Sequence, residues 1–179
     1  MTRTALDFND NWLDPEDMDW VRARMPIPYI NAVPVHLGTD GLPSRIGLLL
    51  RSMADGTLGR ELVGGRIKHG ETIREALLRH AENDLGSLAM PDLPLTLVPF
   101  HIAEYFPEPG KSPFVDPRQH AVALCYILPV RGQCAPRHDA LSLDWLTPQE
   151  LTRPDITSEL SPGQNRLITA ALAHLGILP

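Results

Sequence analysis

The sequence has few cysteines and no long apolar run. Its two cysteines, Cys125 and Cys134, form no CxxC pair and no Cys/His spacing typical of zinc, so we expect neither a disulfide framework nor a zinc site. No apolar stretch approaches the roughly 18 residues that a membrane-spanning helix needs. The first residues are too acidic and polar for a signal peptide. We therefore expect a cytoplasmic protein with no membrane partner.

Basic residues are outnumbered as well. The 179 residues include 16 Lys and Arg against 22 Asp and Glu, which gives a formal net charge of −6. Nucleic acids and anionic membranes attract cationic surfaces, so this balance argues against a nucleic-acid partner but permits a local basic pocket. Apolar residues make up 43% of the chain and charged residues 21%, as in globular proteins. The length fits a single domain over residues 1–179.

Strand patterns dominate the middle of the chain, and helix patterns flank them. Asp14 followed by Pro15 is a typical helix start, and Pro34 predicts an edge strand or a bulge. The patterns predict helices over about 15–24, 72–85 and 163–174, strands over 29–37, 45–51, 60–63 and 120–130, and an extended segment over 95–106. This order indicates an α+β fold, a mixed sheet between helices in an α/β/α sandwich.

The most informative segment is the loop and helix over 64–86, GGRIKHGETIREALLRHAENDLG. Positions 80, 83 and 84 share one face of the predicted helix because residues three and four apart are neighbours. The Asp84 carboxylate, the Asn83 amide oxygen and the Gly64 carbonyl are oxygen ligands of the kind that Mg²⁺ prefers. His80 on the same face would favour Mn²⁺. This face therefore offers candidate ligands for a divalent metal.

This segment resembles the Nudix box. Gly65, Glu71, Arg79 and Gly86 fall on its pattern, whereas its three helix carboxylates fall on His80, Asn83 and Asp84, of which only Asp84 is acidic. The resemblance implies a single-domain Nudix fold and a metal-dependent hydrolase of a nucleoside diphosphate derivative. It also implies that Arg79 orients a carboxylate, for which Glu71 is the candidate.

Within this superfamily the chain is most similar to GDP-mannose mannosyl hydrolases. The shared residues are Gly64-Gly65-Arg66, Glu71-Thr72, Asp84-Leu85-Gly86, and a His138 loop before Trp145-Leu146-Thr147. This likeness implies a nucleotide-sugar substrate and a metal, Mg²⁺ or Mn²⁺, on the Gly64 carbonyl and Asp84. It implies that Arg51 and Arg66 contact the diphosphate, that Arg137 lies beside the substrate, and that His138 is the general base.

Two further hypotheses stay open at this point. The loss of two box carboxylates also fits a Nudix-like module that binds a nucleotide or diphosphate ligand without turnover. In that case His138 is a solvated loop residue, and His120 is the next candidate base if turnover exists. For the assembly we expect a homodimer, because the resembled hydrolases pair and because Trp12, Leu13 and Trp20 form a candidate apolar face.

Overall fold

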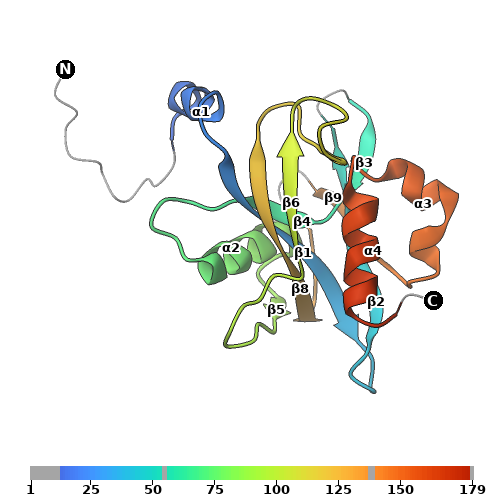
Figure 1. Cartoon of the computed structure of the whole chain (residues 1–179). Coiled ribbons are helices and arrows are strands. Elements are labelled where there is room, and N and C mark those ends of the chain that lie inside the picture. Colours follow the sequence, from blue (N-terminus) through green and yellow to red (C-terminus); the bar gives the residue numbers. More distant parts are fainter. Residues whose placement is uncertain (1–12, 54–55, 137–139, 178–179) are drawn as a thin grey trace.

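A computed structural model describes residues 13–53, 56–136 and 140–177. Its strands form one mixed nine-stranded sheet with helices on both faces (Figure 1). In chain order the elements are α1 (Pro15–Arg22), β1 (Ile27–Leu37), β2 (Pro43–Ser52), β3 (Leu58–Glu61), β4 (Val63–Arg66), α2 (Ile73–Leu85), β5 (Ala89–Pro91), β6 (His101–Phe106), β7 (Phe114–Val115), β8 (Ala121–Gly132), β9 (Ala140–Leu146), the 3₁₀ turn η1 (Glu150–Thr152), α3 (Pro154–Glu159) and α4 (Gln164–His174). The predicted fold class is confirmed.

Strand β1 lies at the centre of the sheet. It pairs in parallel with β8 on one side, and on the other side antiparallel first with β4 and then with β2. The pairing with β4 ends at Ala32 and that with β2 begins at Val35, so Pro34 lies between the two partners. A residue without an N–H fits there, because no ladder hydrogen bond is required. Of the two alternatives predicted for Pro34, the edge strand was therefore wrong, and the irregularity in the pairing of β1 with β2 lies between His36 and Leu37.

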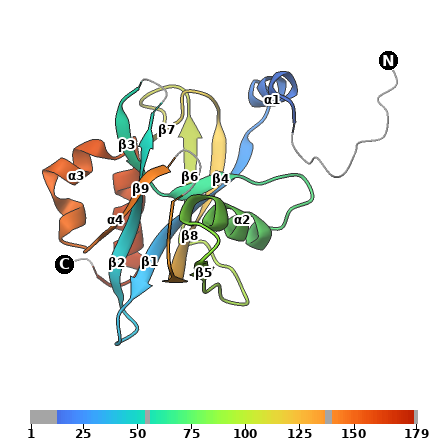
Figure 2. The same ribbon diagram turned by 180° about the vertical axis from the view of Figure 1, so that it is seen from behind.

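Two apolar layers hold the helices to the sheet. Helix α2 covers one face, where Leu77 and Leu85 pack with Ile30 and Leu49. Helices α3 and α4 cover the other face, where residues such as Leu167 pack with Val33 and the other side chains of that core (Figure 2). Residues Ile30 to Val35 of β1 are all buried and serve both layers, since successive side chains of a strand point to opposite faces.

Helix starts are close to those expected from the sequence. Helix α2 begins after Thr72, whose side chain and that of Glu75 form a complete capping box. The segment expected to be extended over 95–106 is a strand only from His101. The strand expected over 60–63 is divided between β3 and β4. Strand β9, which pairs with β2, was not predicted.

Helix α1 stands beside the upper part of the sheet in Figure 1 and buries only Met18. Of the expected apolar face, Trp12 lies outside the described residues, while Leu13 and Trp20 are exposed. The guanidinium of Arg24 lies 4.4 Å from the centre of the Trp20 ring. Within the described part of the chain, no helix has the length and apolarity needed to cross a membrane.

Candidate functional site

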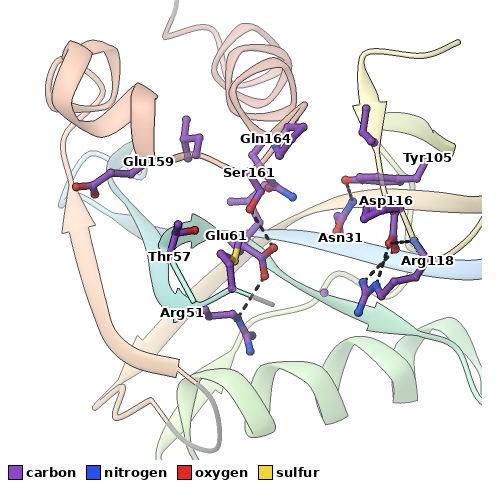
Figure 3. Close-up of a pocket in the computed structure, with 18 of the residues that line it drawn as sticks. Asn31, Arg51, Thr57, Glu61, Tyr105, Asp116, Arg118, Glu159, Ser161 and Gln164 are labelled. Carbon is purple, nitrogen blue, oxygen red and sulfur yellow. Dashed lines mark hydrogen bonds and ion pairs between the residues drawn. The ribbon is translucent and has the colours of Figure 1, made fainter. Parts of the chain in front are cut away.

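A pocket of about 760 Å³ opens where the sheet meets α2, α3 and the start of α4 (Figure 3). Strands β1 to β4 form much of its wall, and the segment before β8 closes one side. Its polar lining consists of Tyr29, Asn31, Arg51, Ser52, Thr57, Glu61, Asp84, Tyr105, Asp116, Arg118, Ser158, Glu159, Ser161 and Gln164, together with the backbone of Gly64. Three of the predicted site residues, Arg51, Gly64 and Asp84, therefore line one cavity.

An ion pair joins β2 to α2 in this pocket. Arg51 Nη2 lies 2.7 Å from Asp84 Oδ1, and only 11% and 9% of the two side chains are exposed. Arg51 Nε lies 3.6 Å from Glu61 Oε2, so the guanidinium lies between two carboxylates. Burial raises the pKa of Asp84 above its usual value, while the charge and hydrogen bond of Arg51 oppose that rise. Asp84 Oδ2 is buried and has no hydrogen-bond partner among the described residues.

The close approach of Gly64 to the central strand requires a glycine. A Cβ at this position would lie 2.6 Å from Asn31 Oδ1 and 2.7 Å from the Ile30 carbonyl oxygen. Asn31 is itself buried, and its Nδ2 donates to the Tyr105 hydroxyl over 2.8 Å. The pocket wall at this point is therefore fixed by backbone contact and a buried polar pair.

The other two predicted metal ligands do not reach the pocket. His80 Nε2 lies 3.0 Å from the Arg66 carbonyl oxygen, and the ring packs on the backbone of Gly65. Burial lowers the pKa of His80. Neither His80 nor Asn83 is among the residues that line the cavity. Helix α2 forms where the spacing predicted it, but of the three candidate ligands on it only Asp84 lines the cavity.

These contacts bear on whether a metal ion fits. The described residues contain no group of three His, Cys, Asp or Glu side chains placed to hold a metal. The remaining box carboxylate, Asp84, already pairs with Arg51, and His80 Nε2 bonds to a backbone carbonyl. Mg²⁺ requires near-octahedral oxygen coordination. The described residues therefore do not fit the divalent metal that the resemblance implied.

Glu71 and Arg79 form the expected pair at the start of α2. Arg79 Nε and Nη2 donate to the two Glu71 oxygens over 2.6 Å and 2.7 Å, and Nη2 also donates to the Arg66 carbonyl over 2.9 Å. The Glu71 carboxylate also accepts from the Lys68 N–H. These bonds, that with Arg79 foremost, lower the pKa of Glu71. The pair therefore ties the loop after β4 to the helix.

A cationic region adjoins the pocket. Burial, with the nearby charges of Arg22 and Arg118, lowers the pKa of Arg66. Arg118 makes a two-pronged ion pair with Asp116, yet 65% of its side chain is exposed. Burial raises the pKa of Tyr29, in the adjacent wall, to about 12, although Arg118 opposes that rise. Arg118 thus lines the cavity with the charges of Arg22 and Arg66 near it, an arrangement suited to an anion.

Of the two histidines considered as general bases, the structure describes only His120. His138 lies outside the described residues, as does Arg137. His120 lies away from the main cavity, in a neighbouring pocket of about 490 Å³ that Arg22 and Arg118 also line. Its ring stacks on Phe106 with the ring centres 4.3 Å apart.

Sequence reasoning missed several pocket residues. Glu61 accepts a hydrogen bond from Ser161 Oγ over 3.1 Å, which joins β3 to the segment before α4. Gln164 is buried at the start of α4, and its Oε1 has no hydrogen-bond partner among the described residues. Asn31 offered a signal, since it is a polar residue within an apolar strand. Glu61, Arg118 and Gln164 offered none, because only the fold brings them together.

Comparison with known proteins places the chain in a family. The profile of a family described as "Domain of unknown function (DUF4916)" matches residues 8–177. The chain belongs to this family. It is also 48% identical to a protein of Jonesia denitrificans described as a "possible" asymmetric diadenosine tetraphosphate (Ap4A) hydrolase. The two structures have a TM-score of 0.84, and the match covers 87% of this chain and 98% of the Jonesia denitrificans chain. No curated protein sequence matches the chain.

More distant structures share the fold. The Nudix domain of Shewanella oneidensis NrtR, solved with ADP-ribose, is 18% identical with a TM-score of 0.60, over 96% of this chain and 99% of its own. A Nudix-family hydrolase of Clostridium perfringens is 17% identical with a TM-score of 0.59, over 87% and 99%. This DUF4916 member therefore has the Nudix fold, as the box predicted.

Proposed function

We propose that the chain hydrolyses a nucleoside diphosphate derivative in the pocket beside α2. The observation that carries this proposal is the arrangement of charge. Arg51 and Arg118 line the cavity, with Arg66 and Arg22 near Arg118, and the side across from Arg118 carries neutral hydrogen-bonding groups beside the carboxylates of Glu61 and Glu159. Guanidinium groups match phosphate oxygens in charge and geometry. The phosphates would therefore lie toward the arginines.

The nucleoside end of the ligand would lie toward Thr57, Ser161 and Gln164. These groups lie across the cavity from Arg118 and Asp116 in Figure 3. Gln164 supports this placement because its buried Oε1 has no hydrogen-bond partner among the described residues. Buried amides normally have partners, so a ligand donor would satisfy this oxygen.

Two groups are candidates for activating water. His138, the base implied by the resemblance to GDP-mannose mannosyl hydrolases, stays a proposal on that ground. Among the described carboxylates of the pocket, Glu61 is 35% exposed, whereas Asp84 is 9% exposed. A general base must reach the water that it deprotonates. Glu61 is therefore the second candidate, and the variants His138→Gln and Glu61→Gln distinguish the two.

The substrate class has two sources of support. The box resemblance favours a nucleotide sugar, and the Jonesia denitrificans relative carries the description of an Ap4A hydrolase. Both kinds of molecule contain a phosphoanhydride linked to a nucleoside. A hydrolysis panel of GDP-mannose, ADP-ribose and Ap4A, each with Mg²⁺, Mn²⁺ or EDTA and read by chromatography, tests the proposal. Turnover of any one supports it.

A second candidate function is ligand binding without turnover. The observation that favours it is the Arg51–Asp84 pair, because the one helix carboxylate of the box that remains already pairs with an arginine. Calorimetry with the same three compounds distinguishes the candidates. Binding without hydrolysis under every metal condition would establish the second function, and the absence of both would refute the two together.

The assembly remains a prediction. We propose a homodimer because Trp20 and Leu13 are exposed near α1. Light scattering at micromolar concentration tests it, and a mass near the 19.8 kDa of one chain would refute it.

A further inference from the structure

One arginine in the pocket, Arg51, lies between two carboxylates. Arg51 is 11% exposed and lies between a buried carboxylate, Asp84, and a half-buried one, Glu61. The three groups come from β2, α2 and β3, so three separate elements place one cation between two anions. Figure 3 shows Arg51 below Glu61, with the contact between them drawn. The positive charge beside Asp84, the remaining helix carboxylate of the box, is therefore supplied by an arginine of the protein.

We propose that Arg51 takes the place of a divalent metal in this protein, so that the pocket binds the diphosphate of its ligand without a metal ion. This inference rests on the proposed function for the identity of the ligand. The claim about the metal rests only on the residues around Arg51. Asp84 is then a positioning residue, which holds the guanidinium, rather than a metal ligand.

Competition for Asp84 supports the proposal. A metal ion could bind Asp84 only by displacing Arg51 or by lying beside its positive charge. Displacement would break the 2.7 Å contact of a buried guanidinium with Asp84, and breaking a buried pair is strongly unfavourable. A metal beside the guanidinium would meet like-charge repulsion, which is strong where water is scarce.

The chemistry of the guanidinium also supports it. An arginine carries five N–H donors in one plane, so a guanidinium that holds a carboxylate can also donate to phosphate oxygens. Arg51 keeps its charge at every physiological pH. It lines the cavity on the wall that also carries Gly64. Arg51 therefore offers the phosphates a fixed positive charge.

The first experiment needs no nucleotide. Electron paramagnetic resonance of free Mn²⁺ measures binding of this metal by the protein alone. We expect no Asp84-dependent binding by the wild type at micromolar Mn²⁺, and a gain in affinity of about tenfold or more in Arg51→Gln, where Asp84 and Glu61 lose the cation between them. Micromolar Mn²⁺ binding by the wild type that disappears in Asp84→Asn would overturn the proposal.

Arg60→Gln is the matched control. Arg60 lies on the neighbouring strand, is 12% exposed, and pairs with two carboxylates, Asp144 and Glu159. It does not line the cavity. If removal of any buried arginine created a Mn²⁺ site, Arg60→Gln would gain affinity as much as Arg51→Gln, and that result would also overturn the proposal.

The folded state needs its own check, because Arg51→Gln leaves Asp84 buried without its cation. The double variant Arg51→Gln/Asp84→Asn removes both charges of the pair, so neither is left buried without the other, and it should fold and bind no Mn²⁺. If the single variant fails to fold, the wild type against Asp84→Asn decides the question. Equal, negligible Mn²⁺ binding by both supports the proposal.

The second experiment uses ADP as the probe in calorimetry. We expect the same Kd within about twofold in EDTA and in Mg²⁺, and about tenfold weaker binding in Arg51→Lys, which keeps the charge but loses the planar donors. Binding that requires Mg²⁺ would overturn the inference while leaving the proposed function intact. Failure of ADP, GDP-mannose, ADP-ribose and Ap4A to bind under both conditions would refute the proposed function, and the Mn²⁺ experiment would still decide the inference.

Discussion

The contact between Gly65 and His80 yields a quantitative prediction for Gly65→Ala. A Cβ at position 65 would lie 2.0 Å from Cε1, 2.5 Å from Nε2 and 2.7 Å from Nδ1 of the His80 ring. The ring is held there, because His80 Nε2 donates to the Arg66 carbonyl oxygen over 3.0 Å. The variant therefore forces the imidazole off β4.

The cost follows from these distances. Carbon atoms in contact normally lie about 3.5–4.0 Å apart, so the ring must move by about 1.5 Å or adopt another rotamer. That movement breaks the hydrogen bond, which costs about 1 kcal/mol. Forcing extra volume into a packed site costs about 1–3 kcal/mol more. We expect Gly65→Ala to lower the free energy of unfolding by about 2–4 kcal/mol.

A double-mutant cycle isolates the clash. His80→Ala alone should cost about 1–2 kcal/mol, since it loses the same hydrogen bond and the buried ring. In Gly65→Ala/His80→Ala the new methyl group enters the space that the ring leaves. The double variant should therefore lose at least about 1 kcal/mol less than the sum of the single losses.

Urea unfolding followed by circular dichroism measures the cycle, with constant slopes as the check on two-state behaviour. His69→Ala is the control. Because His69 is exposed on the same loop, the change in unfolding free energy of His69→Ala should simply add to that of Gly65→Ala. Additivity of positions 65 and 80 within about 0.5 kcal/mol would refute the packing of His80 on β4.

Local sequence signals predicted local structure well. Helix α2 and its capping box follow from Thr72, Glu75 and the apolar spacing, all within one segment. The Glu71–Arg79 pair also follows from the box, because eight residues of loop and helix bring the two side chains together. Gly64 and Asp84 meet at one cavity because the strand–loop–helix unit fixes their relation.

Distant contacts could not be predicted in the same way. Arg51 pairs with Asp84 across 33 positions, and this contact depends on which strand lies beside α2. Strand β9 joins β2 with Trp145 opposite Gly47, a pairing that no local pattern signals. These long-range pairings are set by the register of the sheet, which one strand's sequence does not determine.

Helical spacing alone also could not show which candidate metal ligands reach the cavity. Helical spacing places positions 80, 83 and 84 on one face, but it does not say what each side chain meets. Without a carboxylate at position 80, the imidazole closes onto glycine backbone instead of facing the cavity. Arg51 then supplies the charge that balances Asp84. The sequence shows that two of the three helix carboxylates of the box are missing, and the fold shows that the third, Asp84, pairs with Arg51.

Three further variants test, in this order, the pocket, the end of α2 and the loop before α2. Gln164→Ala should weaken ADP binding about tenfold in calorimetry and leave pyrophosphate binding unchanged, if Gln164 contacts the nucleoside; equal loss for both compounds would contradict that placement. Gly86→Ala should cost about 2 kcal/mol in urea unfolding, because Gly86 has a φ of +95° and a Cβ would lie 2.5 Å from the Ala135 carbonyl oxygen. Glu71→Gln tests the ion pair through pH. Arg79 holds the pKa of Glu71 below its usual value, so ionised Glu71 stabilises the fold above the pKa of an unfolded glutamate, and this stabilisation is lost as the pH falls through the lowered pKa. At pH 7 the variant should be less stable by about 1.5 kcal/mol, a value reduced for the solvent that reaches Arg79. The difference from the wild type should shrink steadily in strong acid, and a difference that stays constant with pH would show that the Glu71 charge contributes nothing.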